Sequence, residues 1–151
     1  MRQLRKDELE ELEAQVRERF HVVDLFAKKR VQEAEEGILI DGEQAFIKKE
    51  GLLVPALHAL QKRQFLKQVV VDAGAVPFVC KGADVMRPGI VSFDAGIQKD
   101  ELVAIVDVAH KKALAVGKML FSGEEAQAMT KGRVVQNVHF VGDEFWKKGK
   151  R

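Results

Sequence analysis

Residues 69–90 read VVVDAGAVPFVCKGADVMRPGI, and this stretch decides the fold of the second half of the chain. It begins with three consecutive β-branched residues, Val69 to Val71, which predict a strand that is buried on both faces. Asp72 and Gly74 should end the strand, because Asp caps free backbone N–H groups and Gly tolerates a positive φ. Pro77 suits the first turn of a helix, where its missing N–H costs no hydrogen bond.

The rest of this stretch predicts the end of that helix and a tight turn. Val76, Val79 and Cys80 fall on one side of the short helix, and Gly82 occupies the position of a C-terminal cap. The segment Arg87-Pro88-Gly89-Ile90 then places Pro and Gly at the two central positions of a type II turn. Residues 69–90 therefore predict a strand, a short helix and a second strand, joined by turns.

Downstream of this stretch, short apolar segments alternate with glycines and polar turns. The sequence predicts strands at residues 102–106, 113–121 and 134–141, a short helix at residues 124–130 and a frayed basic tail at residues 147–151. Gly117 inside a strand marks a bulge or a close approach by another backbone, and Ser122 with Glu125 forms a capping box. Many short strands joined by Gly turns favour a small closed β-barrel, because closure removes exposed sheet edges.

Upstream, the sequence predicts a small α+β domain at residues 1–68, followed by a second domain at residues 69–151. Residues 7–20 carry apolar side chains at spacings of three and four, which predicts an amphipathic helix. Asp7 with Glu10 resembles a capping box at the start of this helix. No linker rich in Pro, Gly or Ser separates the two halves.

A hairpin, a strand and a second helix complete the first domain. Residues 38–40 and 44–48 flank Asp41-Gly42, a dipeptide that favours the primed turn of a β-hairpin. Residues 52–54 continue as a strand, and Pro55 is expected to open the second helix.

The composition is that of an ordinary globular protein. Of the 151 residues, 46% are hydrophobic and 32% are charged. Cys80 is the only cysteine, which excludes an intramolecular disulfide and a zinc-type cysteine cluster. The charged segment at residues 2–13 does not resemble a signal peptide, and no apolar run approaches membrane-spanning length. We therefore expect a cytoplasmic protein that does not enter a membrane.

The charge balance restricts where a nucleic acid could bind. The net charge is only +2, so a nucleic-acid surface must be a local patch. Residues 1–68 contain 13 basic and 13 acidic residues, so the positive excess lies in residues 69–151. The densest basic run of the first half, Lys28-Lys29-Arg30, is interpreted as a solvated loop, with a phosphate contact as the alternative.

The residues predict neither a catalytic nor a metal site. None of the four histidines has a second ligand at metal spacing. His139 is interpreted as a structural histidine near the barrel surface, and Cys80 as a small buried apolar residue. Asp72 and Asp84 are better explained as caps or turn residues than as an acid–base pair. We therefore expect a protein that is not an enzyme and holds no metal or other cofactor.

Six short motifs, taken in order, resemble the PUA domain, a small β-barrel that binds RNA. They are VDAGA at 71–75, KGA at 81–83, VMRPGI at 85–90, AVGKM at 115–119, KG at 131–132 and NVHF at 137–140. Over its whole length the chain resembles the malignant-T-cell-amplified-sequence family and its archaeal stand-alone relatives. The resemblance implies a small N-terminal α+β domain followed by a PUA-like β-barrel.

The resemblance also implies where RNA would bind. In that family RNA lies on the face formed by the first helix of the PUA domain, the Gly-containing loop before it and the adjoining last strands. Cations beside glycines suit this face, because Gly lets an RNA backbone approach while the charge neutralises phosphate. The implied positions are Gly74, Ala75, Val76, Lys81, Arg87, Lys118, Lys131 and Arg133. For any one of them the alternative is that the glycine only shapes a turn and the cation is only solvated.

The resemblance implies non-catalytic RNA binding in translation. The RNA would be tRNA, bound at its acceptor end, or rRNA, at the small ribosomal subunit during initiation or recycling. In eukaryotic relatives the family pairs with a density-regulated protein, or is fused to its initiation-factor-like domain in ligatin, so such a protein is a candidate partner. The chain has no Tyr, and its aromatic residues lie mostly in apolar runs, so aromatic base stacking is not expected.

Two other functions stay open at this point. The chain could be an accessory that delivers tRNA or rRNA to an RNA-modifying enzyme, because PUA domains also occur at the ends of such enzymes. It could also be a protein–protein adaptor whose basic residues are only solvated.

Overall fold

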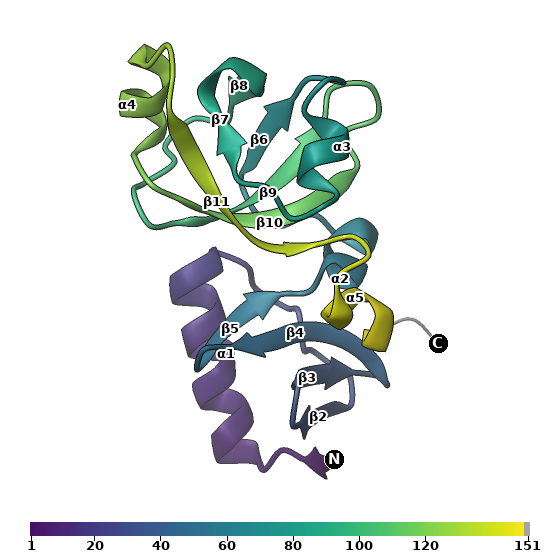
Figure 1. The fold of residues 1–151 in the computed structure, drawn as a ribbon. Helices are drawn as coiled ribbons and strands as arrows, with labels where there is room; N and C mark the ends of the chain where they lie inside the picture. Colours follow the sequence, from purple (N-terminus) through teal and green to yellow (C-terminus); the bar gives the residue numbers. More distant parts are fainter. Residues whose placement is uncertain (150–151) are drawn as a thin grey trace. The chain divides into compact units, whose positions relative to one another are not determined.

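A computed structural model describes residues 1–149, and the chain divides into two units between Phe65 and Leu66. The division lies just before the strand that begins at Gln68. Each unit has a sheet of its own, and the two are described separately below (Figure 1).

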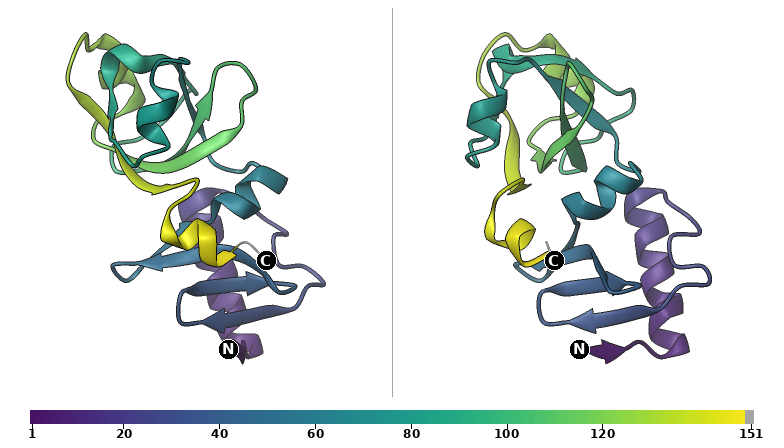
Figure 2. Two further views of the ribbon diagram at one scale, coloured as in Figure 1. Left: turned by 45° about the vertical axis from the view of Figure 1, so that its right-hand side comes forward. Right: turned by 90° about the vertical axis from the view of Figure 1, so that its right-hand side faces the viewer.

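The first unit combines helices α1 and α2 with an antiparallel sheet of strand order β1-β2-β3-β4-β5. Its elements are β1 (Arg2–Gln3), α1 (Lys6–Phe20), β2 (Val31–Ala34), β3 (Gly37–Ile40), β4 (Glu43–Lys49), β5 (Leu52–Pro55) and α2 (Leu57–Lys62). The helix α1 runs alongside this sheet (Figure 2) and buries Leu12, Val16 and Phe20, as its spacing predicted. The Phe20 ring stacks on that of Phe46 from β4, with centroids 5.9 Å apart, so α1 and the sheet share one core.

The predicted hairpin is confirmed, whereas the second helix starts later than expected. Asp41 and Gly42 have φ values of 51° and 80°, which are both positive as a primed turn requires. Pro55 does not open α2: it is the last residue of β5 and pairs with Phe46, and Ala56 is the N-cap of the helix. Pro is tolerated there because β5 is an edge strand, which does not need every N–H for its ladder.

The helix α1 begins one residue earlier than the sequence predicted. Arg5 is its N-cap, and the N–H of Arg5 donates to the carboxylate of Glu8 at 3.0 Å. The predicted capping box of Asp7 and Glu10 is therefore wrong, because Glu8 is the acid that follows the N-cap by three residues.

The second unit is built on a sheet of strand order β7-β11-β10-β9-β6-β8 that curls into a nearly closed barrel (Figures 1 and 2). Its elements are β6 (Gln68–Val71), α3 (Val76–Val79), β7 (Val85–Met86), the 3-10 turn η1 (Arg87–Gly89), β8 (Ile90–Phe93), β9 (Leu102–Asp107), β10 (Ala113–Met119), α4 (Gly123–Ala128), β11 (Arg133–Phe140) and α5 (Glu144–Gly149). All pairings are antiparallel except that of β6 with β9. Within residues 1–149, the edge strands β7 and β8 are joined through η1 but do not pair, so the barrel predicted to be closed is only nearly so.

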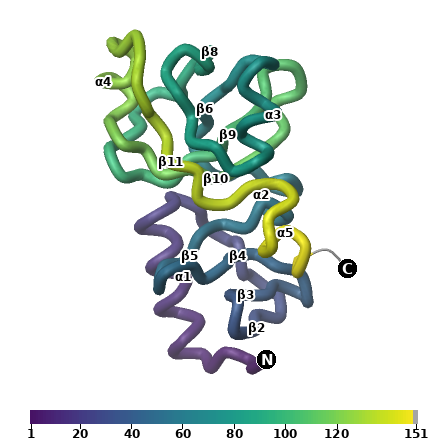
Figure 3. Tube along the Cα trace, viewed as in Figure 1, coloured from purple at the N-terminus to yellow at the C-terminus, as the bar shows by residue number. Residues whose placement is uncertain are grey.

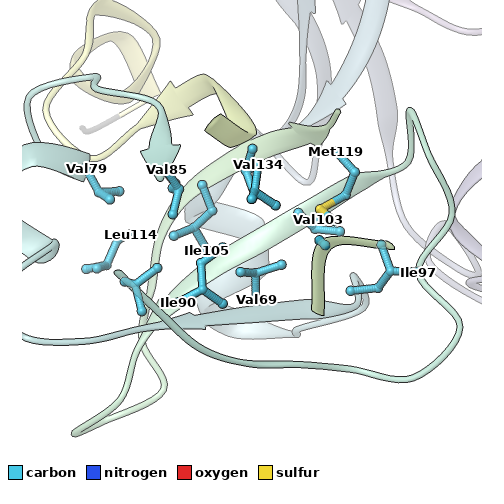
Figure 4. Packing of buried hydrophobic residues seen from close by; sticks show 14 residues of the cluster. Val69, Val79, Val85, Ile90, Ile97, Val103, Ile105, Leu114, Met119 and Val134 are labelled. Carbon is cyan, nitrogen blue, oxygen red and sulfur yellow. The ribbon is translucent and has the colours of Figure 1, made fainter. Parts of the chain in front are cut away.

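Hydrophobic side chains, most of them from the strands, fill the interior of this barrel, and Val79 of α3 and Ile97 of the β8–β9 loop join them (Figure 4). Gly117 of β10 lies in a tightly packed part of the barrel, because a Cβ there would meet Val135 Cγ1 at 2.3 Å and the carbonyl oxygen of Gln136 at 3.0 Å. The register between β10 and β11 also shifts between Val116 and Gly117. Both interpretations of Gly117, a bulge and a close approach of backbone, are therefore confirmed.

The strand and helix predicted for residues 69–79 are confirmed, and Figure 3 traces the chain from β6 through α3 to β8. Asp72 acts as the expected cap, since its Oδ1 accepts the N–H of Ala75 at 2.9 Å. Gly82 has a φ of 92°, and its N–H donates to the carbonyl oxygen of Val79 at 3.0 Å, which closes the end of α3.

Two other glycines of this stretch differ from the prediction. Neither Gly74 nor Gly89 has a positive φ, and residues 87–89 form the 3-10 turn η1. The predicted type II turn and the expected positive φ at Gly74 are therefore wrong. A Cβ on Gly89 would lie 3.1 Å from Ala75 Cβ, so close packing of η1 on the start of α3 selects glycine there.

The last helices differ from expectation in length. The capping box of α4 is confirmed, with the N–H of Glu125 donating to Ser122 Oγ at 3.1 Å. The helix ends at Ala128 and not at residue 130, because Met129 is already extended (φ −77°, ψ 152°). Of the tail predicted to be frayed, residues 147–149 belong to α5, and residues 150–151 lie outside the described residues.

Candidate nucleic-acid interface

A groove of about 470 Å³ lies between α3, β7 and η1 in the second unit. Gly74, Ala75 and Phe78 line it from the α3 side, and Met86, Pro88 and Gly89 line it from β7 and η1. We call it the α3–η1 groove. Its volume falls within the range of ligand pockets, about 300–1,000 Å³. Two of the residues that the resemblance implied for RNA binding, Gly74 and Ala75, therefore face one cleft.

Two large apolar side chains are exposed in the groove. Phe78 is 65% exposed and Met86 is 51% exposed, although both are large and apolar. Apolar side chains that folding leaves uncovered in a cleft are typical of binding sites. The sequence does not predict aromatic base stacking, yet the structure leaves the ring of Phe78 exposed in this groove. Helix geometry could have predicted this exposure: if Val76 and Val79 face the core, Phe78 faces outward.

Asp84 braces one side of the groove. Its Oδ1 accepts the N–H of Asn137 at 2.8 Å, and its Oδ2 accepts a hydrogen bond from the Arg133 guanidinium at 2.9 Å. The Asn137 side chain in turn donates to the carbonyl oxygens of Val79 and Ala83, both at 3.1 Å. These bonds tie β11 to the end of α3, so the interpretation of Asp84 as a structural residue is confirmed.

Arg133 lies beside the groove. It pairs in register with Met86 across β7 and β11, and its side chain is 58% exposed. An ion pair this exposed contributes only about 0–1 kcal/mol, so its guanidinium can exchange Asp84 for a phosphate. Lys81, just beyond α3, and Lys131, two residues before Arg133, are also exposed.

Arg87 has partners of its own. Its guanidinium donates to the carbonyl oxygens of Ile90, at 3.1 Å, and Gln127, at 3.4 Å. It also lies over the ring of Phe93, 5.4 Å from the centroid. These contacts hold the guanidinium against the barrel and tie η1 to α4 and β8. A phosphate contact by Arg87 stays a prediction.

Lys118 lies farther away, on β10. It pairs in register with Gln136 of β11, which is three residues, or about 10 Å, along that strand from Arg133. Its ammonium group lies 3.6 Å from Asp100, and both side chains are well exposed. The structure therefore places Gly74, Ala75 and Arg133 around one groove, whereas Lys118 lies at a distance from it.

Two residues considered for chemistry are structural. His139 is fully buried, so its expected position near the barrel surface is wrong, and its Nδ1 lies 2.8 Å from Asp143 Oδ2. Burial acts to raise the pKa of Asp143, but hydrogen bonds from His139 and from the N–H groups of Trp146 and Phe140 outweigh it and hold the pKa below its usual value. This pair fastens α5 to the end of β11.

Cys80 packs against apolar residues as interpreted, but it is only partly buried. It is half-buried against the barrel core, and burial raises the pKa of its thiol. Within residues 1–149, no three His, Cys, Asp or Glu side chains are grouped as metal ligands would be. No helix in that part of the chain is long and apolar enough to cross a bilayer.

The PUA-domain family model matches residues 67–141. The chain is 44% identical over 112 residues to an uncharacterized protein of Methanocaldococcus jannaschii, covering 74% of this chain and 69% of that protein. It is 36% identical over 122 residues to Malignant T-cell-amplified sequence 1 of Rattus norvegicus, covering 78% and 67%. It is 34% identical over 114 residues to Translation machinery-associated protein 20 of Saccharomyces cerevisiae, covering 71% of this chain and 63% of the yeast protein. The alignments thus span about two thirds of these relatives.

Solved structures share the fold. A hypothetical protein of Pyrococcus horikoshii superposes with a TM-score of 0.84 at 32% identity, covering 97% of this chain and 98% of that one. A chain from an H/ACA ribonucleoprotein bound to a substrate RNA superposes with a TM-score of 0.52 at 31% identity, covering 62% of this chain and 28% of that one.

Proposed function

The chain belongs to the malignant T-cell-amplified-sequence family of PUA-domain proteins, and on this premise we propose that it is a non-catalytic RNA-binding protein that acts in translation. The observation that carries the proposal is the α3–η1 groove, which lies inside the segment that matches the PUA domain. It combines uncovered apolar side chains for a base with nearby cations for phosphate. The H/ACA ribonucleoprotein neighbour and the name of the yeast relative support RNA and translation, respectively.

We propose tRNA, bound through its unpaired acceptor end, as the RNA. The bases of an unpaired end can be splayed out and laid on an apolar side chain such as Phe78, which a duplex does not allow. In this proposal a base would occupy the groove of about 470 Å³, and Arg133, Lys81 and Lys131 would contact the phosphates on either side. In this proposal residues 69–151 form the RNA-binding domain, residues 1–68 form a separate α+β domain, and the protein works in the cytoplasm.

A non-catalytic role accounts for three partly buried carboxylates of the unit, Asp72, Asp84 and Asp143. Asp72 and Asp84 accept backbone N–H groups, and Asp143 is bound to His139 and to two N–H groups. A general acid or base must be free to exchange a proton with a substrate, and these side chains are occupied in holding the fold. The proposal therefore includes no reaction and no cofactor.

Filter binding to tRNA over a range of salt concentrations tests the proposal. If the four exposed cations Lys81, Lys118, Lys131 and Arg133 each contact a phosphate, the logarithm of the affinity should fall with the logarithm of salt with a slope of about −3 to −4. The absence of tRNA binding at low salt would refute an RNA-binding function and leave the adaptor as the remaining candidate.

A second measurement concerns the site of action. We propose that the protein binds at the small ribosomal subunit during initiation or recycling, where a density-regulated-type protein is a candidate partner. Co-sedimentation with purified small subunits, in the presence of tRNA, should then retain the protein in the subunit fraction. If it binds tRNA but stays in the supernatant, the alternative of an accessory to an RNA-modifying enzyme becomes the better account.

A further inference from the structure

We propose that the second unit holds a second nucleotide-binding hollow, which extends the RNA path beyond the α3–η1 groove. This inference rests on the proposed RNA-binding function. The hollow lies between the start of α3 and the turn that joins β9 to β10, and measures about 380 Å³. Its walls include Ala73, Val76, Val108, His110, Lys112 and Leu114.

The hollow and the α3–η1 groove share one short chain segment. Asp72, Gly74 and Ala75 line the groove, whereas Ala73 and Val76 line the hollow. The two sites are thus separated by a single pass of the chain. Ala73 and Gly74 are exposed and small, so an RNA backbone can cross this segment at close range. Val76, which the resemblance implied for RNA binding, lies in the hollow and not in the groove.

The turn that forms the far wall is held in place by its own hydrogen bonds. The Asp107 carboxylate accepts the N–H of His110 at 3.0 Å and that of Lys112 at 2.8 Å. The N–H of Val108 donates to the carbonyl oxygen of Val71 at 3.0 Å, which ties the turn to β6. Because these bonds hold the turn in place, the fold itself orders this wall of the hollow, and binding does not have to order it.

The chemistry of the walls fits a nucleotide. Val108 is 42% exposed and offers an apolar surface for the face of a base. His110, Lys111 and Lys112 follow one another in the turn, and all three are exposed. The one acid that lines the hollow, Asp107, carries a single negative charge, and the two lysines of the turn outnumber it. An apolar wall beside consecutive lysines suits RNA, which offers a base and a phosphate. It suits an apolar peptide less well, because such a peptide leaves the lysines without a partner.

One unpaired RNA strand would fill both the α3–η1 groove and the hollow, and it would cross residues 73–75 between them. One nucleotide would lie against Phe78 in the α3–η1 groove, and the next along the strand against Val108. The phosphates beyond it would then pass Lys111 and Lys112. The RNA site thus reaches from β11, around the start of α3, to the β9–β10 turn.

A charge-removal experiment on the full chain tests this inference. The double variant Lys111→Gln with Lys112→Gln should bind an unpaired RNA of six nucleotides more weakly than the wild type, as measured by fluorescence anisotropy. With a salt slope of about 0.7 per contact on single strands, each lost contact should weaken binding about fivefold at 0.1 M salt. The matched control is Lys147→Gln with Lys148→Gln, which removes the same charge from exposed positions on α5 and should leave affinity nearly unchanged.

A second variant probes the apolar wall. Val108→Asp places a carboxylate in the hollow at an exposed turn position, and it should also weaken binding of the six-nucleotide RNA while the melting temperature stays close to that of the wild type. If the wild type binds RNA but the lysine pair and Val108→Asp both match the control, the hollow is not part of the RNA site and this inference fails alone. If the wild type binds no RNA, the proposed function fails with it.

Discussion

Replacing Asp84 separates the support that this carboxylate gives to the α3–η1 groove from the charge that it carries. Its Oδ1 accepts the N–H of Asn137 at 2.8 Å, and its Oδ2 holds the Arg133 guanidinium at 2.9 Å. Asp84→Ala removes both interactions. Asp84→Asn retains an oxygen that can accept from Asn137 and removes only the charge that attracts Arg133.

The two variants should differ in stability. Asp84→Ala leaves the half-buried N–H of Asn137 without its acceptor, which costs about 1–3 kcal/mol. Loss of the exposed pair with Arg133 adds about 0–1 kcal/mol to that cost. In a unit of this size each kcal/mol lowers the melting temperature by about 4–8 °C. Asp84→Asn should lower the free energy of unfolding by no more than about 1 kcal/mol.

The same two variants should differ in RNA affinity, and Asp84→Asn should bind more tightly than the wild type. Without the carboxylate, Arg133 is free to contact phosphate, and a negative charge is removed from the lining of the groove. One added phosphate contact corresponds to about fivefold tighter binding at 0.1 M salt.

Thermal melting and tRNA anisotropy on the same samples measure both effects. An Asp84→Ala variant as stable as the wild type would show that the bond to Asn137 contributes nothing to the fold. Weaker tRNA binding by a folded Asp84→Asn variant would refute the view that Asp84 competes with RNA for Arg133.

Three further predictions concern single residues. Phe78→Ala should weaken tRNA binding by the loss of one stacking contact, about 1–3 kcal/mol, with little change in melting temperature because the side chain is 65% exposed; unchanged affinity in anisotropy would remove Phe78 from the interface. Gly117→Val should destabilise the barrel by about 1–3 kcal/mol or more, because its Cβ would meet Val135 Cγ1 at 2.3 Å; an unchanged urea midpoint would contradict the packing described here. The folded state lowers the pKa of Asp143, so the stabilisation that this carboxylate provides is present above its ordinary pKa of about 4 and is lost as the pH falls through the folded value. Asp143→Asn should therefore be less stable than the wild type at pH 7, with a difference that narrows below about pH 4; a difference that stays constant with pH in urea titrations would argue against this account.

Several features that depend on neighbouring residues in the sequence could be predicted. The positive φ values of Asp41 and Gly42 follow from turn chemistry alone, and the capping box of Ser122 and Glu125 follows from their spacing. The bulge at Gly117 was predicted in the same way, because glycine weakens a strand and is usually found inside one only at a bulge or where another backbone packs closely.

Features that depend on contacts between distant segments could not be predicted. Gly89 looked like a turn residue with positive φ, but the structure uses it to pack η1 on Ala75, a contact that no local pattern contains. The interior position of His139 likewise depends on β10, where Val116 pairs with it in register.

In the candidate site, too, contacts between distant segments could not be predicted from the sequence. Its cations could be named from the sequence, but not their partners. The contacts of Arg87 with Ile90, Gln127 and Phe93 became visible only in the folded unit. The exposure of Phe78 is not evident from composition, because its neighbours in the sequence are apolar as well. Only its position around the helix axis distinguishes it from the core residues.

The central claim, that RNA binds through the PUA unit, is tested most directly by comparing two charge-matched double variants in tRNA binding. Lys118→Gln with Arg133→Gln removes two positive charges from this unit without placing a second carboxylate beside Asp84. Lys28→Gln with Lys29→Gln removes two exposed charges from the first unit. With melting curves as the control for folding, the first pair should weaken tRNA binding by an order of magnitude or more and reduce the salt slope by about 1.4–1.8, whereas the second should change affinity much less. A larger loss from the Lys28 and Lys29 pair would place the RNA site on the first unit and contradict the account.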